Sequence, residues 1–395
     1  MTFHYADRMS QLQASEIRDL LKLAERPEII SFAGGLPAAE MFPVEALKQA
    51  SIKVLEQQGR QALQYSSVEG YKPLREKIAE RMNAVGVQAT GDHVLVTSGS
   101  QQGLDFAGKI FLNEGDVVIT ERPTYLGAIM AFRAYCPRFV DIPMDDEGMD
   151  MEALENELVS HERVRFIYVI PDFQNPTGKT WSISRRKQLI QLANRFNIPV
   201  VEDNPYGELR FEGERPPAVK SFDTQGRVLF LGTFSKTFCP GMRLGWTLGE
   251  GDLLEKFMLV KQGADLHTNS LAQRQLNQFL EDYSLDEHIA IIKDLYRRRR
   301  DVMMESMDAS FPGHSELTHT YPSGGLFTWV ELPAHLNARD VFRAAVERQV
   351  AFVPGESFYA NGGGYNTLRL NYSTMSEVNI QEGIQRLGTV LKEMI

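Results

Sequence analysis

Short apolar runs alternate with longer helical stretches between about residue 93 and residue 232, and this alternation constrains the fold more than any other feature of the sequence. The runs are rich in β-branched residues, and most are apolar at every position, which is typical of strands covered by helices on both faces. Strands that alternate with helices predict a mostly parallel α/β sheet. The predicted strands are His93–Thr97, Val117–Thr120, Phe139–Ile142, Phe166–Ile170, Pro199–Glu202 and Val228–Gly232.

The pattern changes after about residue 285. One long amphipathic helix is predicted over Asp286–Met307, and shorter strands follow it with helices between and after them, as in an α+β lobe. The first 45 residues are irregular apart from one predicted helix, Ser15–Ala24, and we expect them to pack back on the last lobe. The sequence therefore predicts a large domain over residues 46–285 and a small domain made of residues 1–45 and 286–395. The strands predicted for this lobe are Leu326–Glu331, Ala351–Val353 and Leu368–Tyr372.

The charge balance argues against nucleic acid and anionic membranes as partners. The chain carries 42 Lys and Arg against 52 Asp and Glu, a formal net charge of −10, and an acidic chain repels both polyanions. The basic run Arg297–Arg300 is the one exception. In a helix its side chains point around most of the circumference, so we interpret the run as a solvated face.

The cysteine count and the hydropathy pattern point to the cytoplasm. The only two cysteines, Cys136 and Cys239, form no CxxC pair, which excludes a disulfide scaffold and a cysteine-based zinc module and suits a reducing compartment. We expect no metal site. No uncharged apolar run approaches the roughly 20 residues of a membrane span, and the first residues lack the apolar region of a signal peptide.

The segment Gly232–Trp246 carries the clearest chemical signal. It follows an apolar strand, so Lys236 is expected at the sheet edge where α/β proteins bind ligands. Two hydroxyls, Thr233 and Ser235, precede the lysine, and Arg243 follows seven residues later. Hydroxyls and an arginine suit a phosphate, and a lysine beside them can form a Schiff base with an aldehyde. Alone, the segment is equally consistent with a surface lysine in a Ser/Thr turn.

Three further segments follow predicted strands. Asp172–Gly178 comes after one strand, and Val200–Tyr206 contains Asp203, a carboxylate at the end of an apolar strand that needs a cationic partner such as a protonated pyridine nitrogen. Thr97–Gly103 joins a strand to a helix whose exposed N–H groups suit an anion. Each alone is also consistent with an ordinary turn or helix start, but we expect all of them at one edge of the sheet.

Together these segments resemble the fold-type I, pyridoxal-phosphate-dependent class I/II aminotransferases. The resemblance covers essentially the whole chain, and the order of its Asn-Pro-Thr-Gly, Asp-X-X-Tyr and Ser-Lys-X₆-Arg motifs is specific. Three segments are most similar to the 2-aminoadipate/kynurenine aminotransferase branch: Ser31–Pro37, Gln64–Ser66 and Gly99–Gln102. The resemblance implies an α/β fold, in which a mostly parallel seven-stranded sheet covered by helices forms the large domain and a smaller α+β domain completes the chain.

The resemblance also implies a role for each cofactor-binding residue. Lys236 holds pyridoxal 5′-phosphate as an internal aldimine and later moves a proton between the substrate Cα and the cofactor C4′. Asp203 pairs with the pyridinium nitrogen and keeps the ring an electron sink. Tyr125 stacks on the ring, and Asn175 and Tyr206 bind its phenolic oxygen. The phosphate is held by Ser100, Gln101, Thr233, Ser235 and Arg243, and by Tyr65 of the neighbouring subunit of a homodimer.

Substrate binding is implied in the same way. Arg369 clamps the α-carboxylate of the amino acid, with Asn175 and the Gly35 backbone assisting, because a guanidinium binds a planar carboxylate bidentately. In the aminoadipate branch, residues at the positions of Ser15 and Arg18 meet a distal carboxylate, although Arg18 is also consistent with a surface arginine on an amphipathic helix. The expected substrates are 2-aminoadipate, aromatic or large aliphatic L-amino acids, which exchange their amino group with a 2-oxo acid such as 2-oxoglutarate in a ping-pong reaction.

Two alternatives remain on the same fold. A decarboxylase, β-lyase or racemase would share Lys236 and Asp203, and Arg369 favours transamination over these reactions. A regulator that only senses the cofactor would carry an N-terminal helix-turn-helix, for which the residues before Ser31 leave no room.

Overall fold

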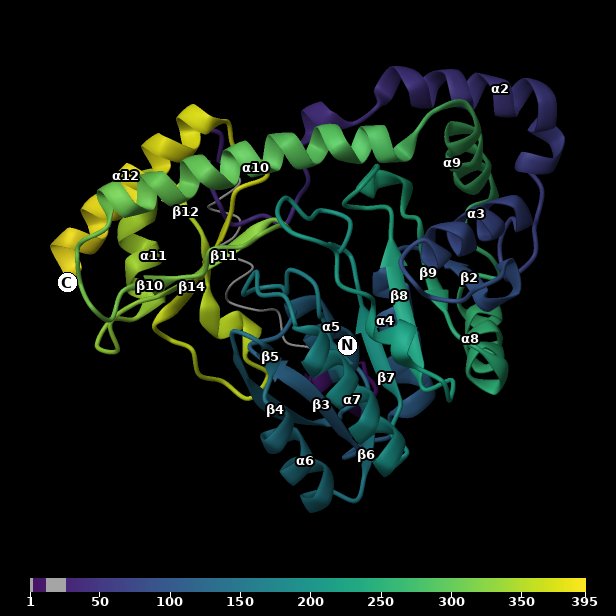
Figure 1. The fold of residues 1–395 in the computed structure, drawn as a ribbon, viewed down its shortest axis with the longest axis horizontal. Helices are drawn as coiled ribbons and strands as arrows, with labels where there is room; N and C mark the ends of the chain where they lie inside the picture. Colours follow the sequence, from purple (N-terminus) through teal and green to yellow (C-terminus); the bar gives the residue numbers. More distant parts are fainter. Residues whose placement is uncertain (1–2, 12–25) are drawn as a thin grey trace.

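A central sheet of eight strands organises the structure, a computed structural model that describes residues 3–11 and 26–395 (Figure 1). Five neighbouring strands, β8 to β4 in sheet order, are parallel, and β9 runs antiparallel to both of its neighbours. In sheet order the strands are β2 (Val94–Thr97), β9 (Gly245–Leu248), β8 (Val228–Thr233), β7 (Val200–Asp203), β6 (Val164–Val169), β3 (Val117–Arg122), β4 (Arg138–Asp145) and β5 (Gly148–Met149).

Helices cover both faces of this sheet, as the apolar strands require. In β6, Phe166 and Tyr168 point into one apolar core, and Ile167 and Val169 point into the other. All four side chains are buried, which explains why the strand shows no polar alternation. One face is covered by α4 (Ser100–Phe111), α5 (Leu126–Arg133) and α8 (Gly251–Ala264), and the other by α6 (Met151–Ser160) and α7 (Ile183–Phe196).

The α/β fold is confirmed, and the structure adds two strands to those predicted from local pattern. β9 begins at Gly245, near the end of the Gly232–Trp246 segment, and ends at Leu248. Its four residues include a glycine and a threonine, so the sequence shows no apolar run long enough to predict a strand there. β5 has only two residues and pairs with the end of β4. It brings the sheet from the expected seven strands to eight.

A smaller antiparallel sheet follows the long helix α10 (Leu285–Ser310). This helix runs along one side of the molecule from α9 (Ser270–Asp282) to α12 (Glu377–Met394), as Figure 1 shows, and packs on α12. In sheet order the strands are β10 (Thr318–His319), β11 (Phe327–Glu331), β14 (Thr367–Asn371) and β13 (Val353–Pro354), and the accompanying helices are α11 (Ala338–Glu347) and α12 (Glu377–Met394).

The segment before residue 45 contacts this second sheet and its helices. β1 (Ile30–Ser31) pairs in parallel with β12 (Val350–Ala351), and the Ala38 N–H donates a hydrogen bond of 2.8 Å to the Tyr296 hydroxyl on α10. These contacts support the proposed division into domains, which stays a prediction. The predicted helix Ser15–Ala24 lies outside the described residues.

The interpretation of Arg297–Arg300 as a solvated face is wrong for half of the run. Arg297 and Arg298 are exposed and pair with Asp294, but Arg299 and Arg300 are 5% and 1% exposed. The guanidinium of Arg299 donates to Glu40 and to the Ser373 carbonyl. Arg300 pairs with Glu212 and Asp301. Buried cations need such partners, and here they tie α10 to three other segments.

Three remaining helices lie at the edge of the main sheet that β2 forms (Figure 1). No helix of the described part of the chain is long and apolar enough to cross a membrane. The helices are α2 (Val44–Ala62), α3 (Lys72–Asn83) and α9 (Ser270–Asp282), and the short 3₁₀ turns are η1 (Asp7–Gln11), η2 (Ala39–Met41), η3 (Gly91–His93), η4 (Val219–Phe222), η5 (Pro240–Met242) and η6 (Gly355–Phe358).

Candidate active site

A cavity of about 910 Å³ lies at the carboxyl ends of the parallel strands. The strand ends place its residues: Asp203 is the last residue of β7, and Thr233 is the last residue of the neighbouring β8. Twelve of the predicted site residues line the cavity, and they are Gly35, Ser100, Gln101, Tyr125, Asn175, Asp203, Tyr206, Thr233, Ser235, Lys236, Arg243 and Arg369.

Among the described residues, one predicted site residue, Tyr65, does not line this cavity. Tyr65 has a side chain that is 78% exposed and that packs edge-on against His267, with 5.8 Å between the ring centroids. Ser15 and Arg18 lie outside the described residues.

The Asp203 carboxylate has one oxygen bound and one oxygen free. Its Oδ2 accepts a hydrogen bond of 2.9 Å from the hydroxyl of Tyr168, and its buried Oδ1 has no partner among the described residues. Burial raises the pKa of Asp203 to about 7, and the Tyr168 hydrogen bond and the positive charge of Lys236 act against this rise. A buried carboxylate that costs free energy in this way is stabilised by a cation placed against Oδ1.

Lys236 lies close to cations, and its environment favours the neutral amine. Its Nζ donates a hydrogen bond of 2.7 Å to the Gly35 carbonyl. Burial lowers the pKa of Lys236 to about 8, the charges of Arg369 and Arg243 lower it as well, and Asp203 opposes them. A lysine with a depressed pKa can act as a nucleophile and as a base near neutral pH.

Hydroxyls and a guanidinium gather at one end of the cavity. The Thr233 hydroxyl donates to Ser235 Oγ at 2.9 Å, and the Arg243 guanidinium donates to the Ser98 carbonyl at 3.2 Å. Gly99, with φ of +79°, lies against Arg243, where a Cβ atom would approach the guanidinium to 2.6 Å. This close approach brings Arg243 up to the N-terminus of α4, which starts at Ser100, and forms an anion site.

Arg369 lines the same cavity from β14 and lies against two aromatic rings. Its guanidinium carbon is 4.2 Å from the centroid of Phe327 and 5.0 Å from that of Phe358. It donates hydrogen bonds of 2.8 Å to Asn175 Oδ1 and 2.7 Å to the Ala33 carbonyl. Burial lowers the pKa of Arg369 to about 10, so the group remains a cation at neutral pH.

Asn175 links Arg369 to Tyr206 by hydrogen bonds. While its Oδ1 accepts from Arg369, its Nδ2 donates to the hydroxyl of Tyr206 at 3.5 Å. Tyr125 lines the same cavity and sits at the start of α5.

Sequence reasoning missed a group of residues that hold these side chains in place. Tyr168 lies in the interior of β6 and donates a hydrogen bond to Asp203 on the adjacent strand. This contact could not be predicted without knowing the strand order. Glu121 is fully buried and accepts from the Ile170 N–H and from Gln174 Nε2. Gln174 immediately precedes Asn175, and its place in the Asp172–Gly178 segment was the only hint of this support.

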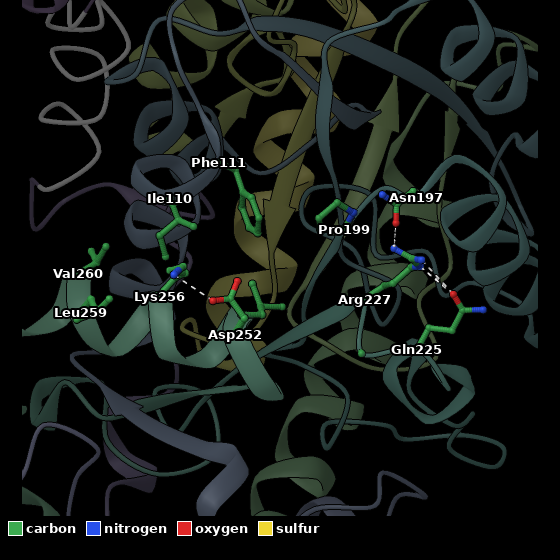
Figure 2. Close-up of a pocket in the computed structure, with 12 residues that line it drawn as sticks. Ile110, Phe111, Asn197, Pro199, Gln225, Arg227, Asp252, Lys256, Leu259 and Val260 are labelled. Carbon is green, nitrogen blue, oxygen red and sulfur yellow. Dashed lines mark hydrogen bonds and ion pairs between the residues drawn. The ribbon is translucent and has the colours of Figure 1, made fainter.

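A second hollow of about 670 Å³ lies at the opposite ends of β7 and β8 and lacks such chemistry (Figure 2). Its charged groups already have partners. Lys256 pairs with Asp252 at 3.0 Å, and Arg227 donates to Gln225 and Asn197. The reactive chemistry therefore lies in the cavity around Lys236.

The residues of that cavity fit pyridoxal phosphate. The free, buried Oδ1 of Asp203 suits a ring N–H⁺, the amine of Lys236 suits the aldehyde, and the Arg243 end suits the phosphate. These three groups are therefore complementary in charge and chemistry to the ring nitrogen, the aldehyde and the phosphate of the cofactor.

Comparisons with known proteins agree with this chemistry. A family model described as aminotransferase class I and II matches residues 27–387. The aromatic-amino-acid aminotransferase 1 of Thermococcus litoralis is 43% identical over 395 aligned residues, which cover 99% of this chain and 94% of that protein.

Two solved structures share the fold over nearly their whole length. The kynurenine aminotransferase of Pyrococcus horikoshii, in complex with PMP, superposes with a TM-score of 0.95 at 41% identity and covers 99% of this chain and 97% of its own. LysN, the α-aminoadipate aminotransferase of Thermus thermophilus, complexed with N-(5′-phosphopyridoxyl)-L-leucine, gives a TM-score of 0.91 at 43% identity with the same coverage. The chain belongs to the class I and II aminotransferases and is a pyridoxal-phosphate-dependent enzyme.

Proposed function

We propose that this aminotransferase accepts 2-aminoadipate, aromatic and large aliphatic L-amino acids and passes their amino group to a 2-oxo acid such as 2-oxoglutarate. The observation that carries the proposal is the presence of Arg369 and Lys236 in one cavity, with Asn175 bonded to the guanidinium. A carboxylate bound to Arg369 holds the substrate so that its Cα lies near the lysine amine. Relatives that act on aromatic amino acids, kynurenine and α-aminoadipate support this substrate range.

In the proposed reaction each side chain has a separate task. Pyridoxal phosphate, when bound, supplies the electron sink that makes the Cα proton acidic. Lys236 would hold the cofactor aldehyde and would take the proton from the substrate Cα, for which its depressed pKa suits it. Asp203 would keep the ring nitrogen protonated, Asn175 and Tyr206 would bind the phenolic oxygen, and Tyr125 would contact the ring.

The phosphate is assigned to the Arg243 end of the cavity. Thr233, Ser235 and Arg243 supply donors from one side, and Ser100 and Gln101 supply donors at the N-terminus of α4. A phosphate held in one place also fixes the position of the reacting carbon relative to Lys236. The contacts to the phosphate therefore orient the reacting groups as well as bind the cofactor.

We propose that Arg18, with Ser15, selects acidic substrates by binding their distal carboxylate. Arg18→Ala is then expected to lower kcat/KM for glutamate and 2-aminoadipate about tenfold or more, because a charge-assisted contact contributes about 1.5–3 kcal/mol. The value for leucine and phenylalanine should change little. The measurement is a panel of amino acids assayed against 2-oxoglutarate and pyruvate, which also tests the proposed substrate range.

A matched control uses another arginine near the N-terminus, Arg26→Ala. The two variants should differ only on acidic substrates. An equal loss of kcat/KM on acidic and apolar substrates in Arg18→Ala would show that Arg18 only supports the fold, and it would contradict the proposed selectivity.

We also propose a homodimer in which each site takes Tyr65 from the neighbouring subunit. Tyr65 is exposed and lies outside the cavity of its own chain, so its hydroxyl is available to a second copy. Tyr65→Phe removes one hydrogen bond to the phosphate and should weaken cofactor binding about tenfold. Sedimentation should show a dimer.

Mixed dimers test which subunit Tyr65 serves. When a Lys236→Ala chain is combined with a Tyr65→Phe chain, one site of the hybrid has both residues intact, and its cofactor affinity should equal the wild-type value. The matched control joins a wild-type chain to a chain with both substitutions. Here the one site that keeps Lys236 receives Phe from the partner in place of Tyr65, so its cofactor affinity should stay low. The reverse result would place Tyr65 in the site of its own subunit, and an active monomer would contradict the dimer.

We further propose a cytoplasmic location. Cys136 and Cys239 are both free thiols, which suits a reducing compartment.

A further inference from the structure

A buried lysine outside the cavity, Lys261, is the centre of a polar cluster on α8. Its side chain is fully buried, and Nζ has three partner residues. It donates to both carboxylate oxygens of Asp265, at 2.9 and 3.0 Å, to Thr268 Oγ1 at 2.8 Å and to Gln102 Oε1 at 3.1 Å. An ammonium group has three protons, so every donor of this buried cation is used.

The cluster continues into the first turn of α4. Gln102 Nε2 donates to Asp265 Oδ2 at 2.9 Å, and the Ser98 hydroxyl donates to the same oxygen at 3.3 Å. Gln102 Oε1 accepts both from Lys261 and from the Ser98 N–H, the latter at 2.9 Å. Both atoms of the Gln102 amide are therefore held by the Lys261–Asp265 pair.

This turn is held from two sides. On the cavity side, the Arg243 guanidinium donates to the Ser98 carbonyl. On the far side, the Lys261–Asp265 pair binds the Ser98 hydroxyl and the Gln102 amide. The residues enclosed between these two contacts are Gly99, Ser100 and Gln101, so the direction of their N–H groups depends on both sides.

We propose that Lys261, together with Asp265, is a positioning residue for the cofactor phosphate: it fixes the Ser98–Gln102 turn so that the N-terminus of α4 stays aligned with the phosphate. The proposal rests on the assignment of Ser100 and Gln101 to the phosphate. Preorganised donors bind an anion more tightly than donors that must first be ordered.

The same helix provides a matched control. Lys256 and Asp252 form an ion pair at the same spacing of four residues and at 3.0 Å, and they line the second hollow on the opposite ends of the strands (Figure 2). The Lys256 side chain is 51% exposed, so its removal leaves no buried charge and disturbs no turn of α4.

The test compares two ligands that differ only in the phosphate. Lys261→Met should weaken pyridoxal 5′-phosphate binding to the cofactor-free enzyme about tenfold, because it removes the Lys261 hydrogen bonds to Gln102 Oε1 and to the Asp265 carboxylate, which in turn binds the Gln102 amide and the Ser98 hydroxyl. Binding of pyridoxal, which lacks the phosphate, should change less than about twofold. Lys256→Met should alter neither. Dissociation constants are measured by absorbance titration, and thermal unfolding is recorded for every variant.

A double variant separates positioning from stability. Lys261→Met leaves the partly buried Asp265 carboxylate without its cation and should lower stability, whereas Lys261→Met with Asp265→Leu removes both charges and should recover most of it. The phosphate-specific loss should persist in the double variant. Recovery of cofactor affinity together with stability, or an equal loss for both ligands, would overturn the proposal.

One more variant tests separately the assignment on which this proposal rests, that Ser100 and Gln101 bind the phosphate. Ser100→Ala should also weaken the phosphate ligand more than pyridoxal. If it does not, the assignment of the α4 N-terminus to the phosphate fails. If it does and Lys261→Met leaves both affinities unchanged, the positioning role of Lys261 alone fails.

Discussion

Replacement of Lys236 by alanine is expected to abolish transamination and the visible absorbance of the lysine-bound cofactor. Lys236 is the only lysine that lines the cavity in the part of the chain that the structure describes, and no other side chain there can both bind the aldehyde and return a proton to the substrate. Activity should fall by several orders of magnitude. The absorbance spectrum and the amino-acid assay of the purified variant check this result.

Chemical labelling gives an independent test of the same residue. Borohydride reduction followed by peptide mapping should mark Lys236 in the wild-type enzyme. Two other buried lysines serve as internal controls, since Lys220 pairs with Asp223 and Lys261 with Asp265, both away from the cavity. A label on any lysine other than Lys236 would contradict the assignment.

Local pattern was sufficient to predict the strands that carry the site, because each is an apolar run followed by polar residues. The parallel arrangement then brings those polar residues together, since the carboxyl ends of β7 and β8 meet at one edge. Asp203 and Thr233 were predictable from this rule alone. The roles of Asn175, Tyr206 and Arg369 depended on the family resemblance, because an arginine in a short strand carries no signal of its own.

Contacts between segments distant in the sequence were not predictable. From the local pattern, Tyr168 is one more apolar position of β6. The structure shows that its hydroxyl contacts Asp203, 35 residues later in the sequence. From the local pattern, Arg299 is a surface arginine. The structure shows that it pairs with Glu40, 259 residues earlier in the sequence. In both cases tertiary packing decides the role of a residue whose local pattern favours another interpretation.

Asp203→Asn is expected to lower turnover at least about a hundredfold while leaving the fold intact. The Tyr168 hydroxyl should then donate to the amide oxygen, which turns the amide N–H₂ toward the position that Oδ1 now occupies. A donor there cannot hold the ring nitrogen protonated, so the electron sink is weakened, a loss of about 3 kcal/mol or more in transition-state stabilisation. Tyr168→Phe is the matched control, because it keeps the carboxylate and removes one hydrogen bond, and it should cost about tenfold or less.

The pH dependence of stability tests the same carboxylate without any cofactor. Burial raises the pKa of Asp203 to about 7 in the folded protein, against about 3.9 when unfolded. Between these values the folded state binds more protons than the unfolded state, so this group's contribution to stability is lost as pH rises from about 4 to about 7. Cofactor-free Asp203→Asn lacks this loss, and its thermal unfolding midpoint should exceed the wild-type value at pH 8 and approach it near pH 4. A constant difference between the two unfolding midpoints across this pH range would show that Asp203 is already paired with a cation before the cofactor binds. In the turnover assay, near-normal activity of Asp203→Asn would show that another group protonates the ring.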